Sequence, residues 1–228
     1  MFTEYFERIN RPGKNKLIEF METSDFYSAP CSTKYHLNKP GGLAEHTLNV
    51  LKCALDLNAR FNCGISEESI IIASIGHDFA KVWFYKESSE EMTPPQENYL
   101  KTLLRQKGLK MPPKVDKTFA SKLIDCLKNN KEVPEYSPGY EVDDKLPLGH
   151  GERSLYLLSK CIDLTDEEVL AVRWHMGAFE VGIHMGYPTG TAYRDALKMS
   201  KLVSILIIAD MEVSFILEAE NEQPVSVL

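Results

Sequence analysis

The chain has 228 residues, of which 26 are Lys or Arg and 33 are Asp or Glu, so its net charge is −7 when the six histidines are neutral. Hydrophobic residues make up 43% of the sequence, which is typical of an ordinary globular protein. The acidic balance disfavours a protein that wraps the phosphates of duplex nucleic acid. We expect a single domain over residues 1–228, because this length is sufficient to bury a sizeable core.

Export and membrane insertion are disfavoured by the distribution of apolar residues. The N-terminal sequence MFTEYFERINRPGK has no apolar stretch behind a basic segment, and the apolar run from Leu202 to Ala209 is too short to span a bilayer. The cysteines are odd in number and contain no C-x-x-C pair, as expected for reduced thiols. We therefore expect a cytoplasmic protein with no membrane partner, and we assign no role to Cys31, Cys53, Cys63, Cys126 or Cys161.

Apolar residues repeat with the period of helices through the first third of the chain. Proline and glycine interrupt this period at Pro12-Gly13 and again before Gly41-Gly42. Ser66 is a candidate N-cap, because two glutamates follow it in the first turn. We expect helical segments over residues 1–22 with a break at 11–13, from 43 to about 62, and from 67 to 78.

Residues 86–148 differ in character from the sequence on either side. They contain two Pro-Pro pairs, three further prolines and an acidic run from Glu87 to Glu91. Helical patches are expected near residues 99–106 and 116–127. We interpret the region as a loop-rich helical insertion that folds over the core, a place where loops often determine substrate selectivity.

The last third of the chain again has the pattern of helices. Gly149-His150-Gly151 precedes one helical pattern, and Thr165 with Glu168 forms the pattern of a capping box before the next. No segment shows the strict alternation of a half-buried strand. We predict an all-α fold whose final helices run over residues 149–161, 165–177 and 191–219.

Several ionisable residues fall on helix faces that are otherwise apolar. Asp210 shares a stripe with Leu206, and His46 shares one with Val50. A buried carboxylate is costly unless it is paired or binds a cation, whereas a single inward histidine is usually a core residue. Four histidines and two aspartates share a simpler explanation, because imidazole and carboxylate groups together suit divalent transition metals. The six candidate ligands are His46, His77, Asp78, His150, His175 and Asp210.

The order of these residues resembles the HD-domain superfamily, named for an adjacent His-Asp pair of metal ligands. The matching motifs lie within residues 43–215 and are GGLAEHT with His46, GHDFAK with His77 and Asp78, LGHGERS with His150, RWHMG with His175, and IIADME with Asp210. The resemblance implies an HD-type helical bundle that holds two metal ions, with Asp78 as the bridge. It implies His46, His77, Asp78 and Asp210 as ligands of one ion, and His150, His175 and the shared Asp78 as ligands of the other.

The activity implied by the resemblance is hydrolysis of a phosphomonoester or phosphodiester by a metal-activated water, with Asp78 and Lys81 as catalytic residues. The cofactor would be one or two divalent ions of Mn, Fe, Zn, Co or Ni. The substrate would be a nucleotide or a small phosphorylated metabolite. Substrate contacts are expected from His36, Lys81, Arg153 and Arg173, although each has an ordinary alternative: solvent exposure for His36 and Lys81, and ion pairs with Glu152, Glu167 or Glu168 for the arginines.

Two other classes of function use the same residues. Di-iron oxygenases resembling myo-inositol oxygenase share this order of ligands and a counterpart of Lys81, so the ligands alone do not separate activation of water from activation of dioxygen. A regulatory module that binds a nucleotide without turnover is the third class. An oxygen-dependent product of the iron form would favour the oxygenase, and tight nucleotide binding without turnover would favour the module. The sequence predicts no oligomeric state.

Overall fold

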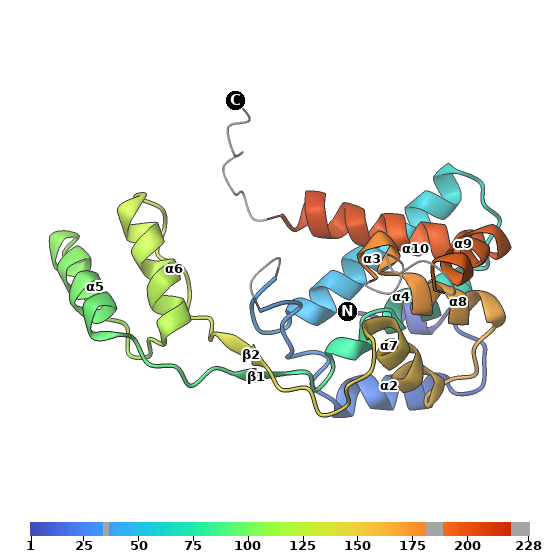
Figure 1. Ribbon diagram of the computed structural model, residues 1–228, viewed down its shortest axis with the longest axis horizontal. Helices are drawn as coiled ribbons and strands as arrows, with labels where there is room; N and C mark the ends of the chain where they lie inside the picture. The colour runs from blue at the N-terminus through green and yellow to red at the C-terminus, as the bar shows by residue number, and fades with distance from the viewer. Residues whose placement is uncertain (34–36, 181–188, 220–228) are drawn as a thin grey trace.

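Most of the chain forms helices, as its apolar periodicity predicts, so the all-α fold class is confirmed. The computed structural model describes residues 1–33, 37–180 and 189–219 (Figure 1). Two single helical turns of 3₁₀ type (Phe79–Lys81 and Gly177–Phe179) and a π-helical turn (Val213–Leu217) accompany the α-helices. The α-helices are α1 (Thr3–Phe6), α2 (Lys14–Thr23), α3 (Gly42–Arg60), α4 (Glu67–Gly76), α5 (Pro94–Gln106), α6 (Lys117–Lys128), α7 (His150–Ser159), α8 (Asp166–Trp174), α9 (Thr189–Met199) and α10 (Lys201–Glu212).

Helix α4 forms the centre of the main helical core. All of its residues from Ser69 to Gly76 are buried, which is the pattern of a helix enclosed on every side. It packs against α3, α7, α8 and α10, and α10 in turn packs against α3 and α8. The C-terminal end of α4 is therefore surrounded by the helices that carry the other candidate ligands.

Residues 85–142, called the arm below, project from this core (Figure 1). Two antiparallel strands of three residues each, β1 (Tyr85–Glu87) and β2 (Tyr140–Val142), form its base, with Tyr85 opposite Val142. Helices α5 and α6 pack on one another beyond the strands and share a small apolar core of their own. The expectation that this region folds over the core was wrong, because its apolar residues are buried within the arm: Leu100, Leu104, Phe119, Ala120, Leu123 and Leu127.

Several local predictions can be compared with the structure. The capping box of Thr165 and Glu168 is confirmed, with both reciprocal hydrogen bonds present. Ser66 occupies the N-cap position of α4, but its side chain makes no capping hydrogen bond. The long helix expected over residues 191–219 was wrong, since Ser200 ends α9 and its hydroxyl accepts a hydrogen bond from the Leu202 N–H at the start of α10. The two strands were missed, because three residues are too few to show alternation.

The backbone before α3 is held close to the start of that helix. Gly41 adopts φ +77°, a left-handed conformation that favours glycine. A Cβ atom on Gly42 would collide with the carbonyl oxygen of Leu37. This glycine pair therefore allows the chain around Cys31 and Leu37 to pack against the end of α3 that carries His46. Within the described residues, no helix has both the length and the apolar character required to cross a bilayer.

Candidate metal centre

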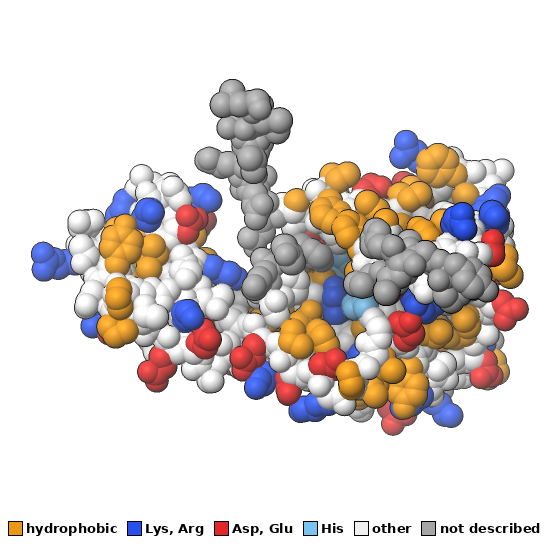
Figure 2. Space-filling model, in the orientation of Figure 1, with side chains coloured by type: hydrophobic (Ala, Val, Ile, Leu, Met, Phe, Trp, Pro, Cys, Tyr) orange, Lys and Arg blue, Asp and Glu red, His pale blue; other side chains and the backbone are white. Residues whose placement is uncertain are grey.

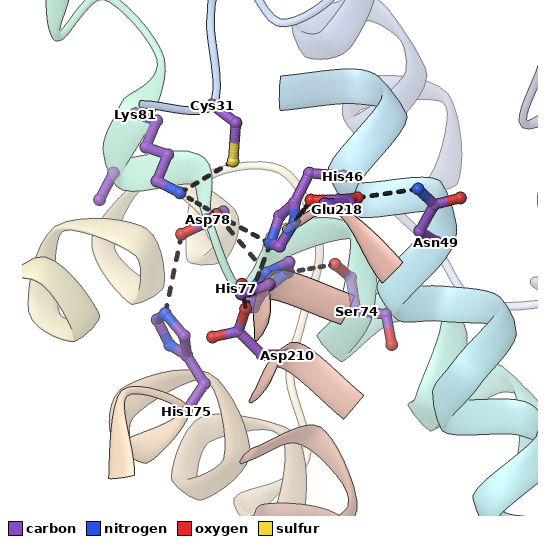
Figure 3. Close-up of polar contacts among 12 residues, drawn as sticks. Cys31, His46, Asn49, Ser74, His77, Asp78, Lys81, His175, Asp210 and Glu218 are labelled. Atoms are coloured by element: carbon purple, nitrogen blue, oxygen red, sulfur yellow. Dashed lines mark hydrogen bonds and ion pairs between the residues drawn. The ribbon is translucent and has the colours of Figure 1, made fainter. Parts of the chain in front are cut away.

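The structure brings the six candidate ligands together from separate parts of the chain. His46 lies on α3, His77 at the end of α4, Asp78 in the turn after α4, His150 at the start of α7, His175 at the end of α8, and Asp210 on α10 (Figure 3). The imidazole rings lie next to one another, with centroid distances of 5.5 Å for His46 and His77, 5.2 Å for His77 and His175, and 5.1 Å for His150 and His175. Asp210 lies beside the first pair, its Oδ1 being 3.2 Å from His46 Nε2.

The carboxylate of Asp78 lies between two pairs of histidines. Its Oδ1 is 2.8 Å from His150 Nε2 and 3.8 Å from His175 Nε2. Its Oδ2 is 3.5 Å from His46 Nε2 and 3.6 Å from His77 Nε2. Each oxygen of one buried carboxylate thus faces its own pair of imidazoles, which is the arrangement that a carboxylate shared between two ions requires.

Three overlapping groups of side chains place their ligand atoms close enough to hold an ion. Within each group the ligand atoms lie within 4.8 Å of one another. Two groups consist entirely of predicted residues and share no member. The third shares His46 with one and Asp78 with the other, and adds a cysteine that was given no role from the sequence. The groups are His46, His77 and Asp210; Asp78, His150 and His175; and Cys31, His46 and Asp78.

Backbone hydrogen bonds orient two of the histidines for metal binding. The Nδ1 atoms of His77 and His175 each lie 2.7 Å from the carbonyl oxygen three residues earlier, on Ser74 and Val172. A carbonyl oxygen only accepts hydrogen bonds, so the neutral ring carries its proton on Nδ1 and a lone pair on Nε2. Both Nε2 atoms are buried and have no hydrogen-bond partner within the described residues. A divalent ion would satisfy these two acceptors, which are costly to bury alone.

A carboxylate from the C-terminal part of the chain orients His46. Glu218 Oε2 lies 2.8 Å from His46 Nδ1, and Glu218 Oε1 accepts a hydrogen bond of 2.8 Å from the Asn49 amide. A carboxylate on the second nitrogen fixes the orientation of a ligating imidazole and raises its basicity. Glu218 was not among the predicted site residues, although its spacing of four and four from Asp210 through Ser214 was an available signal.

The centre contains more buried negative than positive charge. Three carboxylates, those of Asp78, Asp210 and Glu218, face one ammonium, that of Lys81, so two negative charges remain when all histidines are neutral. One remains when His46 is protonated: burial opposes this form, but Cys31, Asp210 and Glu218 raise the pKa of His46 well above its usual value. The side chains of the three carboxylates are only 4%, 19% and 4% exposed, and buried charge without compensation is strongly unfavourable. A single divalent cation would neutralise this excess.

The electrostatics keep the carboxylates ionised and one imidazole neutral. Burial opposes ionisation of Asp78, but Lys81, His77 and hydrogen bonds from neighbouring histidines hold its pKa well below the usual value. Burial likewise opposes ionisation of Asp210, but the hydrogen bond and charge of His46 lower its pKa. Burial lowers the pKa of His77 to about 4. At neutral pH these groups are in the forms that ligate metal ions.

Lys81 reaches into the same centre from the 3₁₀ turn after α4. Its Nζ lies 2.6 Å from Asp78 Oδ2 and donates a hydrogen bond of 3.2 Å to Cys31 Sγ. The attraction of Asp78 raises the pKa of Lys81 well above its usual value, despite the opposing effect of burial. The alternative of a solvated lysine is therefore wrong for this residue, because its side chain is only 15% exposed.

The predicted arginines are held by protein groups instead of lining the centre. Arg153 is buried, pairs with Asp144 at 2.5 Å and donates to the carbonyl oxygens of Leu146 and Val82. These contacts attach the segments on either side of the arm to α7. The geometry therefore favours the ion-pair alternative for Arg153, with a partner in residues 143–148 and not the expected Glu152.

Arg173 also forms ion pairs within the protein. Its guanidinium lies 2.5 Å from Glu152 and 3.2 Å from Glu180, and it stacks on Trp174. Glu152 was one of the partners expected from the sequence. His36, the remaining candidate for a substrate contact, lies outside the described residues.

One of the candidate ligands reaches the protein surface. The side chains of His46, His77 and His175 are completely buried, whereas that of His150 is 29% exposed. A histidine is visible on the surface of the helical core beside a basic side chain (Figure 2). His150 is therefore the most exposed histidine of the cluster within the described residues.

Comparisons with known proteins concern the arm more than the centre. A family model described as a protein of unknown function (DUF3072) matches residues 85–132, which is well under half of the chain and includes none of the six candidate ligands. No curated protein matches the chain. No solved structure matches it.

Proposed function

We propose that the protein is a divalent-metal-dependent phosphohydrolase. The observation that carries this proposal is the position of Asp78, whose two carboxylate oxygens face separate pairs of buried histidines. The buried, unpartnered Nε2 atoms of His77 and His175 and the excess of buried negative charge support a bound cation independently. The order of the ligands along the chain resembles that of HD-domain phosphohydrolases, which supports this choice of reaction by analogy.

Two sets of residues would hold the ions. When bound, such ions activate a water molecule as the nucleophile and stabilise the charge of the attacking and leaving oxygens. Glu218 and the Ser74 and Val172 carbonyls would keep three of the imidazoles in the ligating orientation. The first set is His46, His77, Asp78 and Asp210, and the second is Asp78, His150 and His175.

Lys81 would contribute a positive charge toward the substrate. Its ammonium is held by Asp78 and Cys31, and its side chain is more exposed than that of Asp78. A fixed ammonium stabilises the negative charge that develops on a transferring phosphoryl group. Nucleotides and small phosphorylated metabolites are the substrate classes that fit this combination of metal ligands and one cationic side chain.

The proposal is tested by loading the anaerobically purified chain with Mn²⁺. Hydrolysis of bis(p-nitrophenyl) phosphate and p-nitrophenyl phosphate is then measured, with Asp78→Ala as the blank. We expect turnover by the wild type and none by the variant. Lys81→Ala should retain its metal but lose turnover by about 10²–10³-fold, the usual effect of removing one group that stabilises transition-state charge.

Two results would contradict this function. Oxygen consumption and an oxygen-dependent product from the iron-loaded chain, without phosphate-ester hydrolysis, would establish the di-iron oxygenase instead. Tight binding of a nucleotide by the metal-loaded chain, with no turnover of any ester, would establish a regulatory module. Wild-type kinetics in Lys81→Ala would remove Lys81 from the mechanism while leaving the hydrolase in place.

A further inference from the structure

Cys31 lies in the metal centre, although nothing in the sequence pattern marked it. Its side chain is completely buried, and its Sγ faces Lys81 beside Asp78 and His46 (Figure 3). We infer that Cys31 supplies a sulfur ligand to the ion held by His46 and Asp78. This inference rests on the metal centre of the proposed function and adds a residue that the predicted set of six does not contain.

The backbone fixes Cys31 at this position through contacts on both sides. The Cys31 N–H donates to the Leu37 carbonyl oxygen at 3.2 Å, and the Leu43 N–H donates to the Ala29 carbonyl oxygen at 3.0 Å. The absence of a Cβ atom on Gly42 permits the close approach of Leu37. These bonds join the cysteine segment to the first turn of α3, which also carries His46.

The Cys31 sulfur lies among other atoms that can bind a metal ion, so Cys31 is not an isolated cysteine. Sγ of Cys31, a ring nitrogen of His46 and a carboxylate oxygen of Asp78 lie within 4.8 Å of one another, and all three residues are buried. A separate observation points to a cation at the same place. His77 Nε2 is buried, has no hydrogen-bond partner within the described residues and lies 3.6 Å from Asp78 Oδ2.

A sulfur ligand would change which ions the centre prefers. Thiolates favour zinc and iron over magnesium and calcium, which are bound mainly by oxygen. The Lys81 ammonium, 3.2 Å from Sγ, would offset part of the charge that a thiolate adds to the centre. A mixed set of nitrogen, oxygen and sulfur atoms therefore suits a thiophilic ion such as Zn²⁺ or Fe²⁺.

The other cysteines differ from Cys31 in their surroundings. Within the described part of the chain, none of them belongs to a group of side chains that could hold an ion. Cys161 is the closest match in burial, but its thiol donates to the Leu157 carbonyl oxygen within α7 and its neighbouring turn. Cys161→Ser is therefore the matched control for Cys31→Ser.

The test is X-ray absorption spectroscopy at the zinc edge, on the 228-residue chain loaded with Zn²⁺ and freed of excess ion. We expect a sulfur shell at about 2.3 Å in addition to nitrogen and oxygen atoms at about 2.0–2.1 Å. Cys31→Ser should lose the sulfur shell, keep the nitrogen and oxygen shell, and bind zinc at least tenfold more weakly. Cys161→Ser should keep both shells. A chain with serine at positions 53, 63, 126 and 161 should also keep the sulfur shell.

Each other outcome overturns the inference in a recognisable way. Zinc bound by nitrogen and oxygen alone in the wild type would show that Cys31 only positions Lys81, and the metal centre would stand. A sulfur shell that persists in Cys31→Ser, or disappears in the chain that retains only Cys31, would assign the sulfur to another cysteine. Failure of the wild type to retain zinc, manganese or iron would reject the metal centre and the proposed function together.

Discussion

The helical core and the arm differ in the side chains that they bury and in their net charge. The core encloses a cluster of buried charged groups at the end of α4, whereas the arm encloses a small, purely apolar cluster between α5 and α6. Their net charges also differ. The arm, residues 85–142, contains ten Lys or Arg and nine Asp or Glu, a net charge of +1, whereas the rest of the chain contains 16 basic and 24 acidic residues, a net charge of −8.

This contrast shows that the family match and the candidate metal ligands concern different regions of the molecule. The family match covers residues 85–132 and thus concerns the arm, while all six predicted ligands lie in the core. Within the arm the basic residues are concentrated in residues 98–131, which contain nine Lys or Arg and two Asp, a net charge of +7 that the net charge of the whole chain does not reveal. If the regions are energetically separable, changes in one should leave the other intact, and the following predictions test that separation from the largest expected effect to the smallest.

Removal of the shared carboxylate should have the largest effect. Asp78→Ala eliminates a ligand from two of the three groups in the centre, so we expect bound metal to fall toward zero by elemental analysis. Asp116→Ala is the matched control, because Asp116 is an aspartate of the arm that caps α6 and accepts from Tyr136 and Gly139. Unchanged metal content in Asp78→Ala would contradict the assignment.

Matched cavities in the two apolar clusters should destabilise different regions. Leu123→Ala in the arm and Leu206→Ala in the core each empty a completely buried position, and each should cost about 2–5 kcal/mol in its own region. Both tryptophans, Trp83 and Trp174, lie outside the arm, so their fluorescence reports the core.

In urea, Leu123→Ala should shift the circular dichroism transition of the arm and leave the tryptophan transition and the metal content in place. Leu206→Ala should shift the tryptophan transition and reduce metal retention. Equal shifts of both signals in Leu123→Ala would show that the arm and the core unfold as one unit, and the separation would fail.

Loss of the carboxylate that orients His46 should weaken the centre without abolishing it. Glu218→Gln keeps the shape of the side chain but removes its charge, and we expect metal affinity to fall by about 10–100-fold. Competition with a fluorescent chelator measures this change. Glu141→Gln on β2 of the arm is the control and should bind metal as the wild type does. An unaltered affinity in Glu218→Gln would remove Glu218 from the centre.

The smallest effects should come from the helix caps. Thr165→Ala breaks the capping box of α8 in the core, and Thr93→Ala breaks the cap of α5 in the arm. Each should cost about 1 kcal/mol, because one backbone N–H loses its partner at each helix start. In thermal unfolding, Thr165→Ala should lower the midpoint of the tryptophan fluorescence transition. Thr93→Ala should lower only a transition seen by circular dichroism. A tryptophan shift in Thr93→Ala would argue against separable regions.

The fold class and the inward positions of some candidate ligands could be predicted from the sequence, because both follow from helical periodicity. The choice of all six ligands depended also on their residue types and their order along the chain. His46 and Asp210 each sit on a stripe of apolar residues, so the spacing of those residues is enough to predict that the two side chains point inward. Arg153 shows the limit of this reasoning, since periodicity predicts its helix but not that Asp144 and Val82 would hold its guanidinium.

The features that were missed depend on contacts between distant segments or on very short elements. Cys31 lies in a loop without periodicity, and its place in the centre depends on its backbone bond to Leu37 and on the close approach of Leu37 to the start of α3. Glu218 follows a π-helical turn, whose repeat differs from the period of about 3.6 residues used to assign residues to a helix face. The arm projects because its apolar residues satisfy one another, and a pattern of hydrophobicity does not specify which partner each apolar face will find.

Anomalous X-ray diffraction from crystals of the zinc-loaded or manganese-loaded chain tests the central claim most directly. We predict an anomalous peak at the end of α4, within ligand distance of His77 Nε2 and the carboxylates of Asp78 and Asp210, and loss of that peak in Asp78→Ala. A loaded chain that shows no peak there, or shows ions only on its surface, would contradict the assignment of this buried cluster as a metal centre.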